Sequence, residues 1–179
     1  MSEANAWLLE FSEGLLAAVG ERQMVHLLPS DTALFEVPRS PVYCSRLVIW
    51  HEQILPLMDL GLRLLGRPMV NQGLLAVVAF PGSRSTQTSH GALLLNAPPV
   101  RLRVNDSQAC VLPDSLQIWR QLAVACFEQA EAEIGLVPVL DLAMVFSHPQ
   151  EELTGQAASS ATSATIVLSD SQPCIGELR

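Results

Sequence analysis

The residues that could carry catalytic or metal chemistry are spread thinly along this sequence. They include four cysteines and four histidines, at Cys44, Cys110, Cys126, Cys174, His26, His51, His90 and His148. A zinc site usually shows two closely spaced ligand pairs, and a hydrolytic serine sits in a GxSxG-type turn, but the sequence contains neither pattern. Cys44 or Cys110 can be paired on paper with a distant histidine to form a catalytic dyad. The same pairing can be drawn for any protein that contains cysteine, so it is not evidence of catalysis. We therefore predict no catalytic residue, no metal site and no cofactor, and we expect free thiols in a reducing compartment.

Two aspartates stand in the same local pattern, which favours a structural role over acid–base catalysis. The segments ILPLMDLGLRLLG (54–66) and GLVPVLDLAMVFS (135–147) share it, and each places a proline three residues before the aspartate, as Pro56–Asp59 and Pro138–Asp141. A proline within an apolar run indicates an edge strand, because proline cannot donate to a ladder. An aspartate followed by a helical run indicates a helix N-cap. Two copies of strand, cap and short helix predict two related subdomains.

Composition and charge narrow the class of protein. Apolar residues make up 49% of the sequence and charged residues 16%, as in a folded domain. No apolar run approaches the roughly 18 uncharged residues of a membrane-spanning helix, and Met1 to Asn5 lacks the basic residue of a secretory signal. The net charge is −8, and ten scattered arginines with no lysine form no basic face for nucleic acid. We expect a cytoplasmic protein that neither inserts into membranes nor binds nucleic acid.

Short apolar runs divided by turn residues predict an all-β fold. The expected strands are 6–11, 15–19, 23–29, 45–50, 54–60, 74–80, 92–96 and 97–104. A polar turn is expected at 51–53, a helical turn at 61–66, and irregular connections at 29–42 and 81–91. Arg101 and Arg103 alternate with apolar residues, so they form a solvated face or meet an acidic partner. Residues 116–131 show helical spacing, but we favour a strand at 121–127.

The last part of the sequence changes character. Residues 151–179 are rich in small and polar residues and are typical of a flexible tail. Within this tail, the apolar segment IVLSD (166–170) is either frayed chain, a short strand or a docking peptide.

The order of the segments resembles the CheW-like domain, the chemotaxis coupling fold. The family's first half is followed in order and spacing by AWLLEF, LLAAV, VHLLP, VPRSPVY, RLVIWHE, ILPLMDL and LRLLG, and its second half more loosely by LLAVVAF, GALLLN and VPVLDL. The resemblance covers about residues 7–148. It implies an all-β domain at 1–150, built from two small SH3-like, five-stranded β-barrel subdomains that share a core and carry short helical turns. We place these subdomains at roughly 6–70 and 71–148, with strand exchange between them allowed.

The resemblance also implies a function, that of a non-enzymatic scaffold in a chemotaxis-like signalling pathway. Such an adaptor links a CheA-like histidine kinase to the cytoplasmic domain of a chemoreceptor or to a motility component. The family's NLRG turn, whose arginine helps to form the partner surface, falls here on Ile49, Trp50, His51 and Glu52, and all four residues differ. The family's DRV sequence is also replaced, by Leu95-Asn96-Ala97. These departures suggest a divergent member, in a system that controls type IV pili or surface motility.

We expect partners to bind around this turn, at Arg46, Trp50, His51 and Glu52. Trp50 either packs sideways on its own barrel or stands exposed as an interface anchor, since interfaces are enriched in Trp and Arg. His26 is expected to face the surface. Two other functions stay open. One is a CheW-like regulator that binds another motility or signalling protein without coupling to the kinase, and the other is a small β-barrel enzyme with a cysteine nucleophile.

Overall fold

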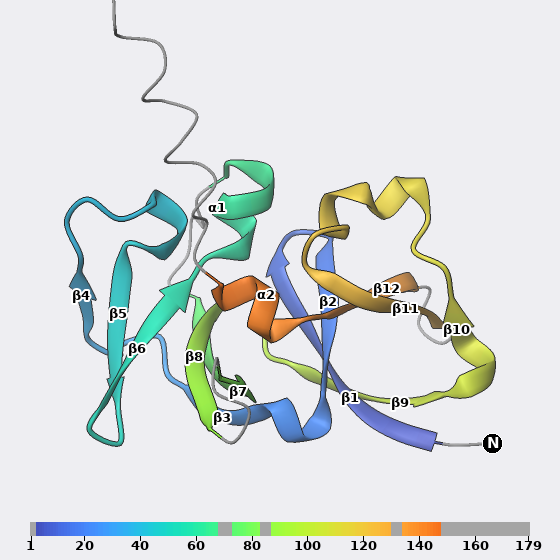
Figure 1. Cartoon of the computed structure of the whole chain (residues 1–179), viewed down its shortest axis with the longest axis horizontal. Coiled ribbons are helices and arrows are strands. Elements are labelled where there is room, and N and C mark those ends of the chain that lie inside the picture. The colour runs from blue at the N-terminus through green and yellow to red at the C-terminus, as the bar shows by residue number, and fades with distance from the viewer. Residues whose placement is uncertain (1–2, 68–72, 83–86, 130–133, 148–179) are drawn as a thin grey trace, which may run out of the picture. The chain divides into compact units, whose positions relative to one another are not determined.

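Strands dominate the part of the chain that the computed structural model describes, which is residues 3–67, 73–82, 87–129 and 134–147 (Figure 1). Six of the described strands follow one another in the chain and form what we call the contiguous sheet, in the spatial order β3-β7-β8-β6-β5-β4. Their bounds are β3 (Met24–Leu28), β4 (Leu34–Glu36), β5 (Arg46–Trp50), β6 (Gln53–Met58), β7 (Leu74–Pro81) and β8 (Thr88–Leu95). The expected tail at 151–179, with its segment 166–170, lies outside the described residues.

The other sheet, which we call the divided sheet, combines an N-terminal hairpin with strands from the second half of the chain. Its spatial order is β10-β11-β12-β2-β1-β9, with bounds β1 (Glu3–Ser12), β2 (Leu15–Gly20), β9 (Val100–Asn105), β10 (Ala109–Cys110), β11 (Ala123–Gln129) and β12 (Gly135–Leu140). Leu8 of β1 lies opposite Val100 of β9, and Ala18 of β2 lies opposite Val139 of β12. The divided sheet therefore takes strands from both expected ranges, 6–70 and 71–148, between which strand exchange was allowed.

Each sheet has an apolar cluster of its own, and a third cluster joins them. The contiguous sheet buries Val48, Leu55 and Val77 among others, and the divided sheet buries Leu8 and Phe127 among others. The joint cluster draws on both sheets and on the segment before β11, with Leu9, Phe11, Leu93, Leu95 and Trp119 among its members. Each such side chain contributes about 1.5–3 kcal/mol when it is removed from water. The all-β fold with two subdomains and a shared core is confirmed.

The strand count in each subdomain differs from the expectation. Among the described residues each sheet has six strands rather than five, and each ends in a very short edge strand, β4 or β10. β4 falls within the expected irregular connection 29–42, where Pro29 and Pro38 hide it from a reading of propensity. Likewise β8 begins at Thr88, inside the expected loop 81–91. The strand favoured at 121–127 is confirmed as β11, which follows a 3-10 segment, η4 (Asp114–Trp119).

The predicted repeat of strand, cap and short helix is confirmed in both subdomains. After β6, the Asp59 carboxylate accepts a 2.9 Å hydrogen bond from the Leu62 N–H and begins helix α1 (Leu60–Leu65). After β12, Asp141 accepts a 3.2 Å bond from the Met144 N–H and begins α2 (Leu142–Phe146). Each carboxylate satisfies a backbone donor that the helix itself leaves unpaired.

The edge-strand prediction for Pro56 and Pro138 is wrong. β6 lies between β5 and β8, and β12 lies between β11 and β2. On one side of each strand, however, pairing begins only after the proline, at Leu57 opposite Ala92 and at Val139 opposite Ala18. A residue without an N–H is therefore tolerated in an interior strand, because the ladder on that side starts one residue later.

Each short helix follows one sheet and packs on the other. Phe146 of α2 stacks on Phe80 of β7, with ring centroids 4.9 Å apart, and it lies so close to Gly91 of β8 that an added Cβ would sit 2.4 Å from its ring. Gly61 of α1 approaches β1 in the same manner, since an added Cβ would lie 3.0 Å from the Phe11 carbonyl oxygen. Both helices thus lie where the two sheets meet and contact both of them (Figure 1).

None of the helices within the described ranges is long and apolar enough to span a membrane.

Candidate interaction surface

The β5–β6 hairpin ends in a tight turn made of His51 and Glu52. Trp50 pairs with Gln53, which leaves two residues in the loop, and their φ angles are 46° and 63°. Positive φ at both positions defines a type I′ turn, which favours Asn-Gly and is unfavourable for residues with a Cβ. The expected polar turn is confirmed at His51 and Glu52, whereas Gln53 already belongs to β6. The turn is built from residues that strain it.

The two faces of this hairpin have opposite environments. Val48 and Leu55 lie opposite each other and point into the barrel core. One position along, Ile49 and Ile54 also lie opposite each other, but 54% and 68% of their surfaces are exposed. Strand neighbours alternate between faces, so this difference follows from the pleat.

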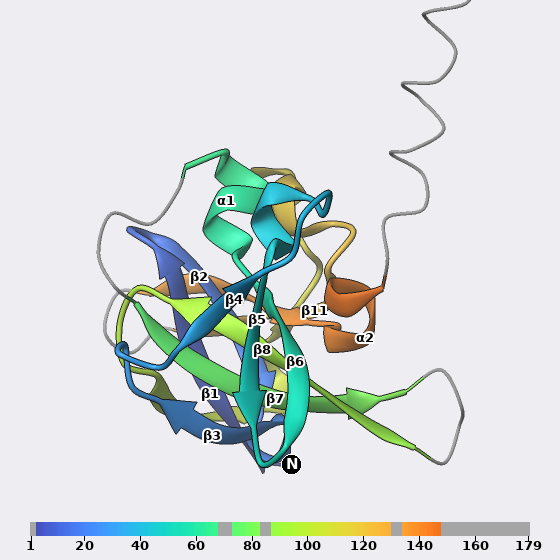
Figure 2. The same cartoon turned by 90° about the vertical axis from the view of Figure 1, so that its left-hand side faces the viewer.

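The exposed isoleucines belong to a larger apolar surface on three strands. Leu47 of β5 lies opposite both Phe35 of β4 and Pro56 of β6, on the same side as Ile49. We call this surface the outer apolar face and define it as Phe35, Leu47, Ile49, Ile54 and Pro56. Figure 2 shows the backbone of β4, β5 and β6 at the front, with α1 at the end of the hairpin opposite the turn. A row of apolar side chains across a solvent-facing sheet is typical of a protein–protein contact.

Trp50 packs on its own barrel, which decides between the two orientations considered for it. The side chain is half-buried against the core of the contiguous sheet. Its Nε1 is buried and has no hydrogen-bond acceptor among the described residues. Trp50 thus packs at one end of the barrel, and the exposed side chains beside it are those of Ile49 and His51.

Three histidines from three elements surround the Trp50 ring. The ring centroids of His51, His90 and His26 lie 4.5, 5.5 and 6.4 Å from it. His26 is exposed, as expected. Sequence spacing contains no sign of this grouping, because only the pairing of β3 with β7 and of β7 with β8 brings His26 and His90 to the same barrel end. A group of three or more His, Cys, Asp or Glu residues able to hold a metal ion does not occur within the described ranges.

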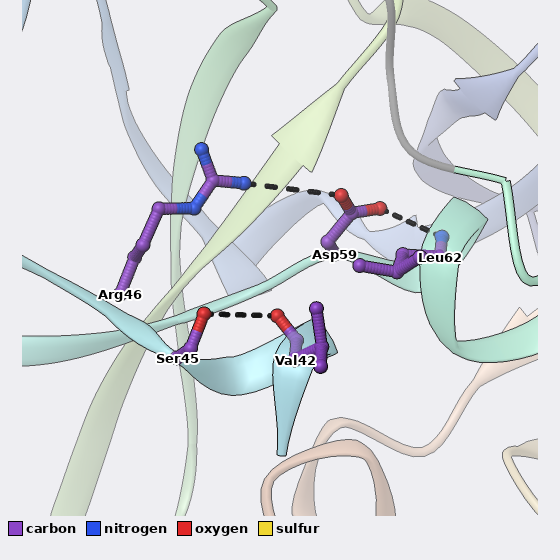
Figure 3. A network of polar contacts seen from close by, with 5 residues as sticks. All are labelled: Val42, Ser45, Arg46, Asp59 and Leu62. Atoms are coloured by element: carbon purple, nitrogen blue, oxygen red, sulfur yellow. Dashed lines mark hydrogen bonds and ion pairs between the residues drawn. The ribbon is translucent and has the colours of Figure 1, made fainter. Parts of the chain in front are cut away.

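Arg46 lies at the opposite end of β5 from the turn. Its guanidinium is 3.8 Å from the Asp59 carboxylate, which is the carboxylate that caps α1 at Leu62 (Figure 3). Four residues of strand, or about 13 Å, separate Arg46 from Trp50. Of the four residues expected to bind partners, the structure therefore gathers Trp50, His51 and Glu52 at the turn, and it places Arg46 elsewhere in a contact that supports α1.

Two of the described cysteines, Cys44 and Cys126, are poor nucleophiles. Burial raises the pKa of the Cys44 thiol, although the nearby Arg63 acts against it. Burial, and next the neighbouring Cys110, raise the pKa of Cys126 to about 12. A thiol with a raised pKa is almost fully protonated at neutral pH, and it attacks far more slowly than a thiolate. Cys174 and His148 lie outside the described residues.

Arg101 makes a contact within the chain. It forms an ion pair with Glu21 of η1 (Glu21–Gln23), whose carboxylate also accepts a 2.9 Å hydrogen bond from Asn5. The Arg101 side chain is 56% exposed and the Glu21 side chain 39%, so solvent screens the pair and it contributes little to stability. The solvated-face interpretation of Arg101 fits this position.

Comparisons with known proteins identify the fold. No protein-family model matches the chain, and no curated protein matches it either. Among solved structures, the chain is similar to the scaffolding protein TtCheW from Thermoanaerobacter tengcongensis, with a TM-score of 0.69 at 13% sequence identity. The match covers 84% of this chain and 97% of that one. The chain therefore has the CheW-like fold that its segment order suggested.

Proposed function

We propose that this chain, which has the fold of a chemotaxis scaffolding protein, is itself a non-enzymatic adaptor that holds signalling proteins together in the cytoplasm. In this proposal it links a CheA-like histidine kinase to the cytoplasmic domain of a chemoreceptor or to a motility component. The observation that carries the proposal is the outer apolar face on β4, β5 and β6, together with the strained turn beside it.

The outer apolar face supports the proposal through its exposure. Ile49 and Ile54 oppose each other at the end of this face nearest the turn, and Phe35 lies half exposed at its edge. Single exposed apolar residues are ordinary, but a contiguous group on a rigid sheet costs solvation free energy that a partner recovers by covering it. Rigid strands also present these side chains with little conformational entropy to lose on binding.

The turn supports the same location. His51 and Glu52 adopt positive φ without being glycine or asparagine, and such strain is concentrated at functional sites. Their side chains are exposed at the tip of the hairpin, next to Ile49 and Ile54. We propose that partner contact extends from the outer apolar face onto this turn. Trp50, packed on the core, and Arg46, paired with Asp59, stabilise the hairpin.

A second candidate function rests on the identity of the turn residues. By the resemblance to the CheW-like family, His51 stands where that family has the arginine of its partner surface. An imidazole cannot reproduce the bidentate contacts of a guanidinium. This favours a regulator that binds another motility or signalling protein, for example in a type IV pilus system, without coupling to the kinase. The cysteine-enzyme alternative has no such support, because the raised pKa values of Cys44 and Cys126 disfavour a thiolate.

The test is a capture experiment from the cytoplasm of the native cell with the tagged full chain, followed by direct binding with the purified partner. The baits are wild type, Ile54→Asp and the turn variant His51→Asn/Glu52→Gly. The control is Val111→Asp, at an apolar residue of the other barrel that is 90% exposed. We expect Ile54→Asp to weaken binding at least about tenfold, as for the centre of an interface, and Val111→Asp to bind like wild type.

The turn variant separates binding from folding. Asn-Gly suits a type I′ turn, so this variant is expected to gain about 1 kcal/mol of stability. A gain in stability together with weaker binding supports a functional turn. Recovery of a histidine kinase supports the coupling function, and recovery of a different signalling protein supports the regulator. Equal binding by all baits would show that the β5–β6 hairpin is not part of the interface.

A further inference from the structure

Two cysteines that are distant in the sequence lie side by side in the divided sheet. β10 pairs antiparallel with β11, and the register places Cys110 directly opposite Cys126. Directly opposed residues of an antiparallel pair have Cα atoms about 4.5 to 5.5 Å apart, which lies within the range of about 4.4 to 6.8 Å over which disulfides form. The two thiols are close enough for Cys110 to raise the pKa of Cys126, and both are free.

We propose that Cys110 and Cys126 form a modification site at which a hydroperoxide produces a cross-strand disulfide. This assignment rests on the register of β10 and β11 and on the contact between the two thiols. It is independent of the outer apolar face, which lies on the contiguous sheet. Neither thiol is needed for the scaffold function proposed above.

The chemistry balances with hydrogen peroxide as the oxidant. The Cys110 sulfur attacks one peroxide oxygen and the O–O bond breaks, so that Cys110 becomes a sulfenic acid and one water leaves with the thiol proton. The Cys126 sulfur then attacks the Cys110 sulfur and displaces the hydroxyl group, which leaves as a second water with the Cys126 proton. Two thiols lose two electrons and two protons, and the peroxide is reduced to two waters.

The surroundings of the two sulfurs assign these roles. Cys110 lies on the two-residue edge strand β10 and is half-buried, whereas Cys126 is only 2% exposed on the interior strand β11. A peroxide therefore reaches Cys110 first. Cys126 lies directly opposite Cys110 in the strand register, so it is already in place to serve as the resolving thiol.

The disulfide would close residues 111–125 into a covalent loop. This loop contains η4, and its Trp119 and Leu122 side chains lie in the cluster that joins the two sheets. Cross-linking the ends of the loop restricts the unfolded chain more than the folded one. We therefore expect the oxidised protein to melt at a higher temperature than the reduced protein.

The experiment maps cysteines in the full-length protein after brief treatment with a few equivalents of hydrogen peroxide. Because the chain has no lysine, trypsin cuts only at arginine, and a glutamate-specific protease divides the products further. The relevant peptides are 104–120 with Cys110, 121–128 with Cys126 and 40–46 with Cys44. The expected product is peptide 104–120 linked to peptide 121–128, with a mass lower by two hydrogen atoms than the sum of the two.

Variants then check the assigned roles. Cys110→Ser and Cys126→Ser must each abolish the link, whereas Cys44→Ser must retain it. In Cys126→Ser, a dimedone probe should label Cys110, because the sulfenic acid has lost its resolving partner. Links that run mainly to Cys44 or Cys174 would overturn the proposal, as would sulfinic acid at Cys110 with Cys126 still a thiol. The wild-type map decides the question even if a serine variant fails to fold.

Discussion

Arg63 of α1 donates a 2.9 Å hydrogen bond to the backbone carbonyl of Val145 in α2. The same guanidinium lies 5.3 Å from the ring centre of Tyr43. α2 is only five residues long, so its last carbonyls have no partner inside the helix. One cation from the helix of the first subdomain thus satisfies the end of the equivalent helix in the second.

Replacing Arg63 should loosen the contact between the two helices. Arg63→Met keeps the apolar stem but removes the donor to Val145 and the cation above Tyr43. We expect the free energy of unfolding in urea to fall by about 1–3 kcal/mol, as for a lost charge-assisted bond that leaves an acceptor unpaired. Arg67→Met, at an exposed arginine four residues on, should change it by less than about 0.5 kcal/mol. Equal changes in the free energy of unfolding for Arg63→Met and Arg67→Met would mean that the contacts of Arg63 do not stabilise the fold.

Neighbouring positions on β6 should respond in opposite ways to the same substitution. Leu55 is 3% exposed and Ile54 is 68% exposed. Leu55→Asp buries a charge in the core of the contiguous sheet, and we expect a loss of at least about 3 kcal/mol, enough to unfold the subdomain. Ile54→Asp should melt near the wild-type temperature by circular dichroism. A Leu55→Asp protein that stays folded would contradict the pairing of Leu55 with Val48 and the inward direction of both side chains.

The two capping aspartates should differ in what they contribute. Asp141→Ala removes only the hydrogen bond to Met144, and we expect it to cost about 0.5–1 kcal/mol. Asp59→Ala removes the cap at Leu62 and also the ion pair with Arg46, at a site where Asp59 itself is buried. We expect a larger cost of about 1–3 kcal/mol. Thermal and urea denaturation of both variants check the order, and a reversed order would argue against a supporting role for Arg46.

Stability should decline in alkali because of Cys126. Its pKa is raised from the ordinary 9.0 to about 12 in the folded chain, so between these values the unfolded state has lost the proton while the folded state keeps it. The stability that the buried thiol contributes is complete below pH 9 and is lost as the pH rises toward 12, at no more than about 1.4 kcal/mol per pH unit. In the presence of a reductant, the free energy of unfolding of Cys126→Ala should decline less steeply with pH than that of wild type. Parallel declines would show that Cys126 is not the cause.

The local features of the fold could be predicted from the sequence because they depend on short-range physics. The presence of a polar turn at 51–52, the capping role of Asp59 and the strand at 45–50 each follow from a few neighbouring residues. The strand 34–36 escaped prediction because prolines surround it, and its pairing with β5 decides its conformation. The position of Pro56 was misjudged because the sequence does not reveal where a neighbouring ladder begins.

The candidate site was predicted only in part, for a related reason. The turn at 51–52 was identified from its residues, but the outward direction of Ile49 and Ile54 depends on which face of the hairpin meets the barrel core. The grouping of His26 and His90 with Trp50, and of Cys110 with Cys126, depends on strand pairing between segments distant in the sequence. Such pairings are set by the whole hydrophobic pattern, and no local motif reports them.

The split membership of the divided sheet has a consequence for the order of folding. Every strand of the contiguous sheet lies between residues 24 and 95, so that sheet can form while the rest of the chain is still being synthesised. The β1–β2 hairpin emerges before the other described strands but cannot complete its pairing until β9 and β12 have been made. Its apolar residues Leu9 and Phe11 therefore stay unburied in the nascent chain until strands translated many seconds later have been made. This hairpin, made first and docked last, is where a ribosome-associated chaperone would be most needed.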